Sequence, residues 1–217
     1  MPLQNRVTPA GELIRVDARG TFMGNRGGVL HNSDREIVRP YASRRWITCV
    51  LEFKGRRRTV MTPDRYTELF FLDEATALAA GHRPCAECRR ERFNAFKEAW
   101  IHAANSPAPT FLYADDIDRE LHRSRIDHRK GKVTYRARLS SLPDGAFVRI
   151  EDSNYLIWRG KLARWSPWGY LEKDQLPAGI AVEVLTPEQI VRCLRHGYKP
   201  EIHPSLRVHA APAAFSR

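Results

Sequence analysis

A strand, a short helix and a pair of cysteines are predicted within the sequence FFLDEATALAAGHRPCAECRR, which spans residues 70–90. The mainly apolar residues 68–72 favour a β-strand. Asp73 is expected to cap the helix that follows, because an Asp side chain accepts hydrogen bonds from the free N–H groups at a helix start. We expect the helix to end at Ala80, since Gly81 suits the left-handed conformation that often follows a helix.

The spacing of Cys85 and Cys88 is that of a metal-binding pair. Two intervening residues allow both thiolates to reach one tetrahedral Zn²⁺ at about 2.3 Å. A helix expected over residues 87–104 begins beside the second cysteine, and a helix start favours the thiolate form. A redox-active pair has the same spacing, but Pro84 precedes the two cysteines instead of lying between them. The pattern therefore favours a metal site.

Residues 70–90 resemble the second half of the Ada-type metal-binding domain. This family has an aromatic strand, an Ala-rich helix and a Gly-x-Arg-Pro-Cys-x-x-Cys segment, and a looser similarity extends over residues 24–92. The resemblance implies a structural Zn²⁺ with Cys85 and Cys88 as two of its ligands. It also implies a basic surface in contact with DNA.

The upstream part of the same family pattern implies two further ligands. Many relatives have a Gly-Asn pair followed by a His and a Cys, and residues 24–49 contain a similar series with a longer insertion. We therefore expect a Zn²⁺ site with four ligands, which are His31, Cys49, Cys85 and Cys88.

Several of these residues have simpler interpretations. Cys49 lies in an apolar stretch and is equally a candidate for an inert buried thiol, while His31 is a candidate for an ordinary loop histidine. His82 is a rival fourth ligand, although its closeness to Cys85 would strain the site. Cys193 lies among apolar residues and is expected in the core. Methyl transfer of the kind known in the family needs an exposed zinc thiolate, and the apolar surroundings of Cys49 do not favour one.

The charge of the chain is strongly positive and clustered. The 217 residues include 36 Lys and Arg against 25 Asp and Glu, a net charge of +11. Residues 41–65 carry a net +5 and residues 119–138 a net +6, so these two stretches hold the whole excess. Such clusters suit a polyanion, because contacts to phosphates release condensed counterions. A basic surface that serves solubility is the alternative.

A nucleic acid, most simply DNA, is the expected partner. The side chains expected to contact its phosphates are Arg44, Arg45, Arg56, Arg57, Arg58, Arg89, Arg90, Arg123, Arg125, Arg129 and Lys130.

The fold class expected is α+β, in two parts. Residues 1–106 are predicted to form a β-rich zinc-binding domain, residues 111–205 a basic α+β domain, and residues 206–217 a loose tail. The Pro- and Ser-containing segment 105–110 is the expected linker. In the first part, residues 46–53 are expected to pair with residues 58–61 as a hairpin. In the second part, strands are predicted at 133–138, 146–150, 155–158 and 180–184, and helices at 115–126 and 186–196, the latter capped by Thr186.

A catalytic pair is possible on the helix expected over residues 115–126. Asp118, His122 and Arg125 fall on one face of that helix, where a carboxylate can orient a histidine as general base. These residues make a DNA glycosylase or nuclease the second functional hypothesis. Pro2 is a more remote candidate, since an N-terminal proline can act as a nucleophile. The alternative is a solvated basic helix that only binds phosphates.

The remaining expectations concern location and class. No apolar run reaches the ~18 residues of a membrane span, and the N-terminus lacks the apolar stretch of a signal peptide. We expect a cytoplasmic, nucleoid-associated protein without a membrane partner. The leading hypothesis is a zinc-containing DNA-binding protein involved in DNA repair or processing. The third hypothesis, after the DNA-modifying enzyme, is an RNA-binding or protein-interaction module with structural zinc.

Overall fold

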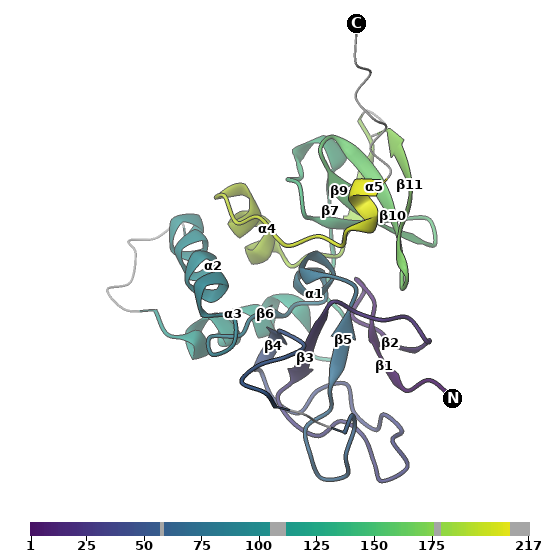
Figure 1. Cartoon of the computed structure of the whole chain (residues 1–217). Coiled ribbons are helices and arrows are strands. Elements are labelled where there is room, and N and C mark those ends of the chain that lie inside the picture. Colours follow the sequence, from purple (N-terminus) through teal and green to yellow (C-terminus); the bar gives the residue numbers. More distant parts are fainter. Residues whose placement is uncertain (57–58, 105–111, 176–178, 209–217) are drawn as a thin grey trace, which may run out of the picture.

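Two six-stranded sheets form the scaffold of the protein, as seen in a computed structural model that describes residues 1–56, 59–104, 112–175 and 179–208. One sheet belongs to the N-terminal half of the chain and the other to the C-terminal half, with helices between and beside them (Figure 1). This arrangement confirms the predicted α+β class. The boundaries of the two predicted domains stay a prediction, and the linker 105–110 lies outside the described residues.

The N-terminal sheet has the strand order β2-β1-β5-β3-β4-β6. Strand β4 pairs antiparallel with β3 on one side and parallel with β6 on the other. The predicted hairpin between residues 46–53 and 58–61 is therefore wrong, because both edges of β4 are already occupied and the strand ends at Cys49. The strands are β1 (Gln4–Val7), β2 (Leu13–Arg15), β3 (Phe22–Arg26), β4 (Trp46–Cys49), β5 (Leu69–Phe71) and β6 (Arg83–Pro84).

Helix α1 (Glu74–Ala79) lies at the centre of the molecule, between the two sheets (Figure 1). The carboxylate of Asp73 accepts a hydrogen bond from the Thr76 backbone N–H at 2.8 Å, which confirms the predicted cap. All six helix residues are buried. Their small side chains allow close approach from both sides, and the helix contacts β5 of one half and β8 of the other. The segment of residues 70–90 thus joins the two halves.

The longer helices pack their apolar faces against the C-terminal half. Helix α2 (Arg90–Ala103) buries Phe93, Phe96 and Trp100, as its helical periodicity predicts. Helix α4 (Glu188–Arg195) packs on α2. Thr186 is not its cap: Pro187 takes that position, and the Thr186 hydroxyl accepts a hydrogen bond from the Phe147 N–H at 2.8 Å. Helix α3 (Ala114–Arg125) lies near the N-terminal sheet.

The C-terminal sheet has the order β11-β10-β9-β8-β12-β7, with antiparallel pairing throughout. Four of its strands lie at the predicted places, while β10 and β11, a hairpin rich in charged and aromatic residues, were not predicted. The strands are β7 (Tyr135–Arg138), β8 (Phe147–Ile150), β9 (Ser153–Trp158), β10 (Lys161–Ser166), β11 (Gly169–Gln175) and β12 (Ala181–Val184).

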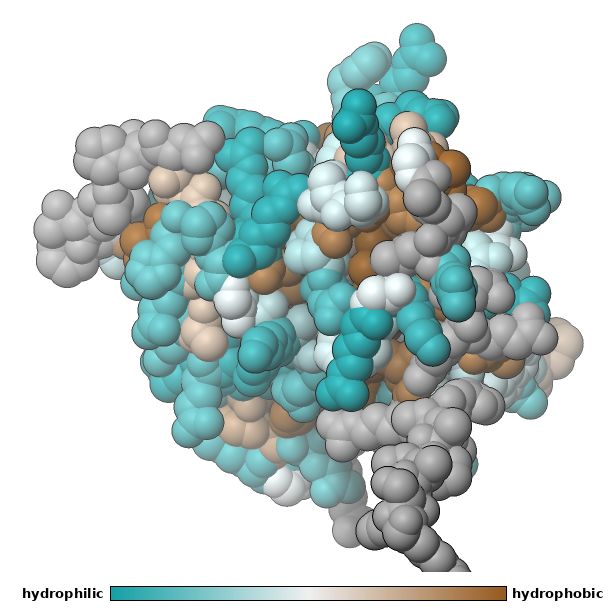
Figure 2. Space-filling model, turned by 90° about the horizontal axis from the view of Figure 1, so that it is seen from above, coloured by the Kyte–Doolittle hydropathy of each residue, from teal (hydrophilic) through white to brown (hydrophobic). Residues whose placement is uncertain are grey.

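The chain continues past this sheet into a short helix, α5 (Ser205–Val208). Leu206 is 2% exposed and packs in a core cluster with Phe147 and Tyr170. The first residues of the predicted tail are therefore helical, and residues 209–217 lie outside the described part. Seen from above, the surface mixes hydrophilic residues with patches of hydrophobic ones (Figure 2). No helix in the described ranges is both long and apolar enough to cross a membrane.

Candidate metal centre

Three cysteines from two separate parts of the chain converge beside the N-terminal sheet. Cys49 ends β4, Cys85 directly follows β6, and Cys88 lies in the turn before α2. The parallel pairing of β4 with β6 brings them together, and the Cys85 N–H donates to the Thr48 carbonyl at 2.9 Å. Their sulfur atoms all lie within 4.8 Å of one another. This is close enough for the three side chains to hold one metal ion.

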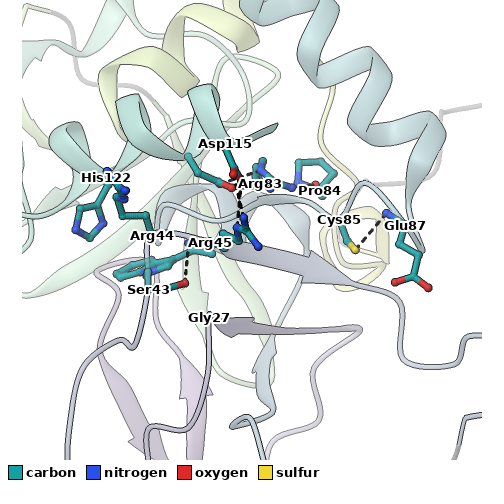
Figure 3. Close-up of polar contacts among 12 residues, drawn as sticks. Gly27, Ser43, Arg44, Arg45, Arg83, Pro84, Cys85, Glu87, Asp115 and His122 are labelled. Atoms are coloured by element: carbon teal, nitrogen blue, oxygen red, sulfur yellow. Dashed lines mark hydrogen bonds and ion pairs between the residues drawn. The ribbon is translucent and has the colours of Figure 1, made fainter. Parts of the chain in front are cut away.

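Hydrogen-bond donors surround the sulfur atoms. The Glu87 N–H donates to Cys85 Sγ at 3.4 Å (Figure 3), and the Cys88 N–H also faces that sulfur. Hydrogen bonds from the thiols of Cys49 and Cys88 lower the pKa of Cys85 far below its usual range, and the same bonding raises the pKa of Cys49. Backbone N–H groups directed at a sulfur favour its thiolate form, and thiolates are the ligands of soft metals. The donor set fits a metal such as Zn²⁺.

His31 is not brought to the cysteines, contrary to the prediction. Its Nδ1 is 2.6 Å from the Thr67 hydroxyl and its Nε2 is 3.2 Å from the Thr62 carbonyl oxygen. The carbonyl can only accept, so Nε2 carries the proton and Nδ1 accepts from Thr67. Both ring nitrogens are thus used to close the loop around residues 62–67. The sequence spacing could not exclude this outcome, because a histidine in a loop can bind a metal or can form buried hydrogen bonds that close the loop.

The rival ligand, His82, is also placed elsewhere. It is fully buried, with its ring against Phe71 at 4.7 Å and Trp46 at 5.1 Å between centroids. The Nε of Arg26 donates to its Nε2 at 3.4 Å. Burial, and then the nearby Arg26, hold the pKa of His82 well below its ordinary value, so the ring is neutral. Cys193 is buried in the main core cluster, as expected.

A cavity of about 420 Å³ adjoins the three cysteines. Its walls include apolar side chains from β3, β4 and β5 and three carboxylates, Glu52, Glu68 and Glu87. Glu68 is buried and accepts from the Met61 N–H at 2.8 Å, while Glu87 pairs with Arg56 at 3.2 Å. Among the described His, Cys, Asp and Glu residues, none joins the three cysteines as a fourth ligand. A tetrahedral metal there keeps one position for water or another ligand.

The two basic stretches of the sequence lie against each other in the structure. The loop before β4 contacts α3: Arg125 donates to the Arg44 carbonyl at 2.5 Å, and the rings of Tyr41 and His122 are 5.1 Å apart. Arg45 forms a bidentate ion pair with Asp115, with N–O distances of 2.9 and 3.1 Å (Figure 3). Five of the predicted phosphate contacts are exposed in this region. Arg45 is paired with Asp115, and the other four are Arg44, Arg123, Arg129 and Lys130.

Two of the predicted phosphate contacts are corrected by burial. Arg89 is 2% exposed at its side chain, and it pairs with Glu74 at 3.1 Å and Glu201 at 2.5 Å. Arg125 is 1% exposed. Each of the two guanidinium groups binds partners from distant parts of the sequence inside the protein. Neither is therefore available to contact a phosphate at the surface. Arg90 is exposed, Arg56 is exposed but paired with Glu87, and Arg57 and Arg58 lie outside the described residues.

The predicted catalytic pair is not assembled as expected. Asp118 is 2% exposed, and its two carboxylate oxygens accept from Arg83 at 2.9 and 2.7 Å. Within the described part of the chain no hydrogen bond joins Asp118 to His122. The Nδ1 of His122 instead lies 3.4 Å from Nη2 of Arg125, and burial together with that cation lowers the pKa of His122. Asp118 thus acts in packing α3 onto β6, and the acid/base role of the pair stays a prediction.

Sequence reasoning missed two cations that donate hydrogen bonds inside the protein, one in each half of the chain. Arg26 is 3% exposed although it is charged, and Lys132 donates from its ammonium to the Ala79 carbonyl at 2.6 Å. The alternation along β3 contains a signal, since Phe22, Gly24 and Arg26 share the buried face of the strand. For Lys132 no local pattern distinguishes it from a surface lysine.

Comparison of the chain with known protein families, with curated proteins and with solved structures finds no match.

Proposed function

We propose that this chain is a zinc-containing DNA-binding protein with a role in DNA repair or processing. Cys49, Cys85 and Cys88 hold the Zn²⁺, and exposed cations beside α3 contact the DNA phosphates. The observation that carries the proposal is the convergence of three sulfur atoms with backbone N–H groups directed at them.

The zinc ion has a structural part in this proposal. Bound by three thiolates, it joins the end of β4 to the turn before α2, next to the two-residue strand β6 that pairs with β4. Zinc-binding free energy is then also folding free energy, since the unfolded chain does not present the three sulfurs together. The similarity of residues 70–90 to the Ada-type domain supports the choice of zinc and the link to DNA repair.

The DNA surface is proposed where the two basic stretches meet. Arg44, Arg123, Arg129 and Lys130 are exposed there, and Arg125 holds the two segments together from beneath. Cations fixed on neighbouring segments contact successive phosphates without reading bases, so the expected binding depends on salt more than on sequence.

The metal is tested by elemental analysis of the purified protein and by X-ray absorption at the zinc edge. We expect one zinc per chain with three sulfur ligands and one lighter ligand. A Cys193→Ala variant is the matched control, because Cys193 lies in the main core cluster and is not one of the three grouped cysteines, and it should keep the metal. Absence of bound metal after expression in zinc-supplemented medium contradicts the proposal, and a site with four sulfur ligands contradicts the assigned ligand set.

DNA binding is tested by fluorescence anisotropy with single- and double-stranded DNA and RNA over a series of salt concentrations. A variant with Arg44, Arg123, Arg129 and Lys130 changed to Gln should lose most of the salt dependence, by roughly one unit of slope per phosphate contact. A variant with Arg15 and Arg19 changed to Gln, compared with a double variant of Arg123 and Arg129 that loses the same charge, controls for net charge. Binding that is insensitive to salt would favour a protein-interaction module.

The same experiment separates a binding protein from an enzyme. Intact-mass analysis of undamaged, alkylated, abasic and crosslinked oligonucleotides after incubation shows any chemical change. An unchanged mass with salt-dependent binding supports the proposal as stated. A change in one substrate that His122→Ala abolishes, while binding survives, would instead establish the enzymatic hypothesis.

A further inference from the structure

A second cavity, of about 370 Å³, lies between the two halves of the chain. Arg26 and Trp46 contribute from paired positions on β3 and β4, and Arg125 and Lys132 contribute from the second half. The same two strands carry Cys49 at their other end, opposite Met23. The cavity is thus distinct from the one beside the cysteines.

The three innermost cations of this cavity have only neutral hydrogen-bond acceptors. Arg26 donates to the Gly11 carbonyl at 2.8 Å and to the Pro40 carbonyl at 3.2 Å. Arg125 donates to the carbonyls of Gly81 and Arg44, and Lys132 to that of Ala79. Over the described ranges, no carboxylate lies within 4.0 Å of any of the three. Arg26 and Arg125 are buried and Lys132 is half-buried. Buried charges without a paired carboxylate are unfavourable, so an anion entering the cavity would be stabilised.

Trp46 holds the two guanidinium groups in place. Its ring is 4.2 Å from Cζ of Arg26 and 4.2 Å from Cζ of Arg125. The Nε of Arg125 is buried and has no hydrogen-bond partner in the protein. A buried donor without an acceptor is rare in native structures, so the Arg125 guanidinium keeps unused hydrogen-bonding capacity at the wall of the cavity.

The charge around the cavity remains positive when every lining residue is considered. Lys130 and Arg149 add two further cations, and Glu12 and Glu183 supply the two carboxylates. Glu183 is already paired with Arg149 at 3.5 Å, and Glu12 is exposed. Burial, followed by repulsion from Arg26, lowers the pKa of Lys132 to about 7, while Glu183 opposes the shift.

We propose that this cavity binds a phosphate group. Two arginines and a lysine can together neutralise a dianion, and the planar guanidinium and compact ammonium groups are the usual phosphate ligands. The volume lies in the range of small-molecule sites, so it accommodates a phosphate with part of the molecule that carries it. The site goes beyond the proposed surface contacts to DNA. The phosphate belongs either to a small metabolite, such as a nucleoside monophosphate, or to the 5′ end of a nucleic-acid strand.

Calorimetric titration with three probes tests this inference and separates the two sources. The probes are inorganic phosphate, a nucleoside 5′-monophosphate, and one short oligonucleotide prepared with and without a 5′-phosphate. Saturable binding of the first two assigns a small-molecule ligand. Preference for the phosphorylated oligonucleotide, with weak binding of the free compounds, assigns a strand end.

Lys132→Gln identifies the cavity as the place of binding. It should weaken phosphate binding about tenfold, since it removes one charge-assisted hydrogen bond. Lys161→Gln changes an exposed lysine on β10 in the same way and should have no effect. Circular dichroism and the melting temperature confirm that both variants are folded. Should Lys132→Gln be misfolded, Lys130→Gln at the exposed side of the cavity provides the same test with a smaller effect.

Two results overturn the inference. One is the absence of saturable binding by inorganic phosphate and the nucleoside monophosphate at low ionic strength, together with equal binding of the oligonucleotide with and without its 5′-phosphate. The other is equal weakening by Lys132→Gln and Lys161→Gln. Neither result bears on the proposed DNA surface, which is measured with an oligonucleotide that has no terminal phosphate.

Discussion

The two ends of the β3–β4 strand pair carry opposite chemistry. At one end Cys49 lies opposite Met23 and joins two other thiols, and at the other end Trp46 lies opposite Arg26 among buried cations. Three residues of strand, about 10 Å, separate the two ends. One end therefore suits a cation and the other an anion. A rigid strand pair keeps the two sites apart, so that neither neutralises the other.

The largest expected effect comes from a substitution that removes one of the three cysteines and leaves the cation cavity intact. Cys85→Ser takes away a sulfur that receives hydrogen bonds from both other cysteines, and we expect loss of bound zinc and a large fall in melting temperature. Structural zinc contributes on the order of 10 kcal/mol in small zinc domains, so loss of a ligand removes several kcal/mol. Elemental analysis and circular dichroism measure both. Full zinc content and unchanged stability in Cys85→Ser would show that the cluster is not a metal site.

Breaking the buried ion pair between Arg83 of β6 and Asp118 of α3 should affect the cation cavity and not the metal site. Asp118→Asn leaves Arg83 buried without its counter-charge, and this should lower the free energy of unfolding by about 3–5 kcal/mol. Because the pair fastens α3, which carries Arg125, phosphate binding should weaken while zinc content stays unchanged. Denaturant unfolding and titration measure the two effects. Asp115→Asn, in the exposed pair with Arg45, is the control and should leave the melting temperature within error.

The result for Asp118 also distinguishes packing from catalysis. A variant that is destabilised and binds oligonucleotides more weakly in proportion supports the packing role. A variant that keeps its stability and loses only turnover of a substrate would restore Asp118 as an acid/base residue.

The sequence predicted the metal end far better than the cation end, for a physical reason. Cys85 and Cys88 are close in the chain, so their spacing alone predicts a shared metal, and Asp73 is a local cap that the structure confirms. Only the third sulfur depended on the parallel pairing of β4 with β6, and the resemblance supplied it. His31 shows that sequence spacing does not identify every ligand. Its ring hydrogen-bonds to Thr67 and does not reach the cysteines.

The cation end has no local signature. Arg26 and Trp46 meet through strand pairing, Arg125 and Lys132 lie at the two ends of one loop, and tertiary packing brings these two pairs together. In a basic chain, each cation among them resembles a surface residue that contacts phosphates. Arg125 was in fact predicted to do so, and its burial could not be inferred without knowing that Gly81 and the loop at Arg44 lie against it.

The pH dependence of the free energy of unfolding tests the charge of Lys132 in the cation cavity. Its pKa is about 7 in the folded protein, lowered by burial and by Arg26, Arg149 and Arg125, with Glu183 opposing. The unfolded chain has the ordinary value of about 10.4, so between about pH 7 and pH 10 the unfolded state binds a proton that the folded state does not. Stability due to this group therefore rises with pH over that window, by up to about 1.4 kcal/mol per unit.

The measurement is the difference in unfolding free energy between the wild type and Lys132→Met. That difference should rise from about pH 7 to about pH 10 and stay constant below pH 7. Saturating phosphate should reduce the slope, because a bound anion favours the protonated lysine. Parallel stability curves for the two proteins would contradict an uncompensated buried charge at this end.

The smallest expected effect comes from substituting one exposed arginine near the cation cavity or one near the cysteines, and comparing the two variants. Arg129 follows α3 on the side of the cation cavity, and Arg90 begins α2 beside the cysteines. If DNA lies over the junction of the two basic stretches, Arg129→Gln should reduce the salt slope of binding by about one unit and Arg90→Gln should leave it unchanged. Anisotropy titrations at several salt concentrations measure both. Equal losses would mean that the nucleic acid spans both ends of the strand pair, and a loss confined to Arg90→Gln would move the DNA surface to the metal end.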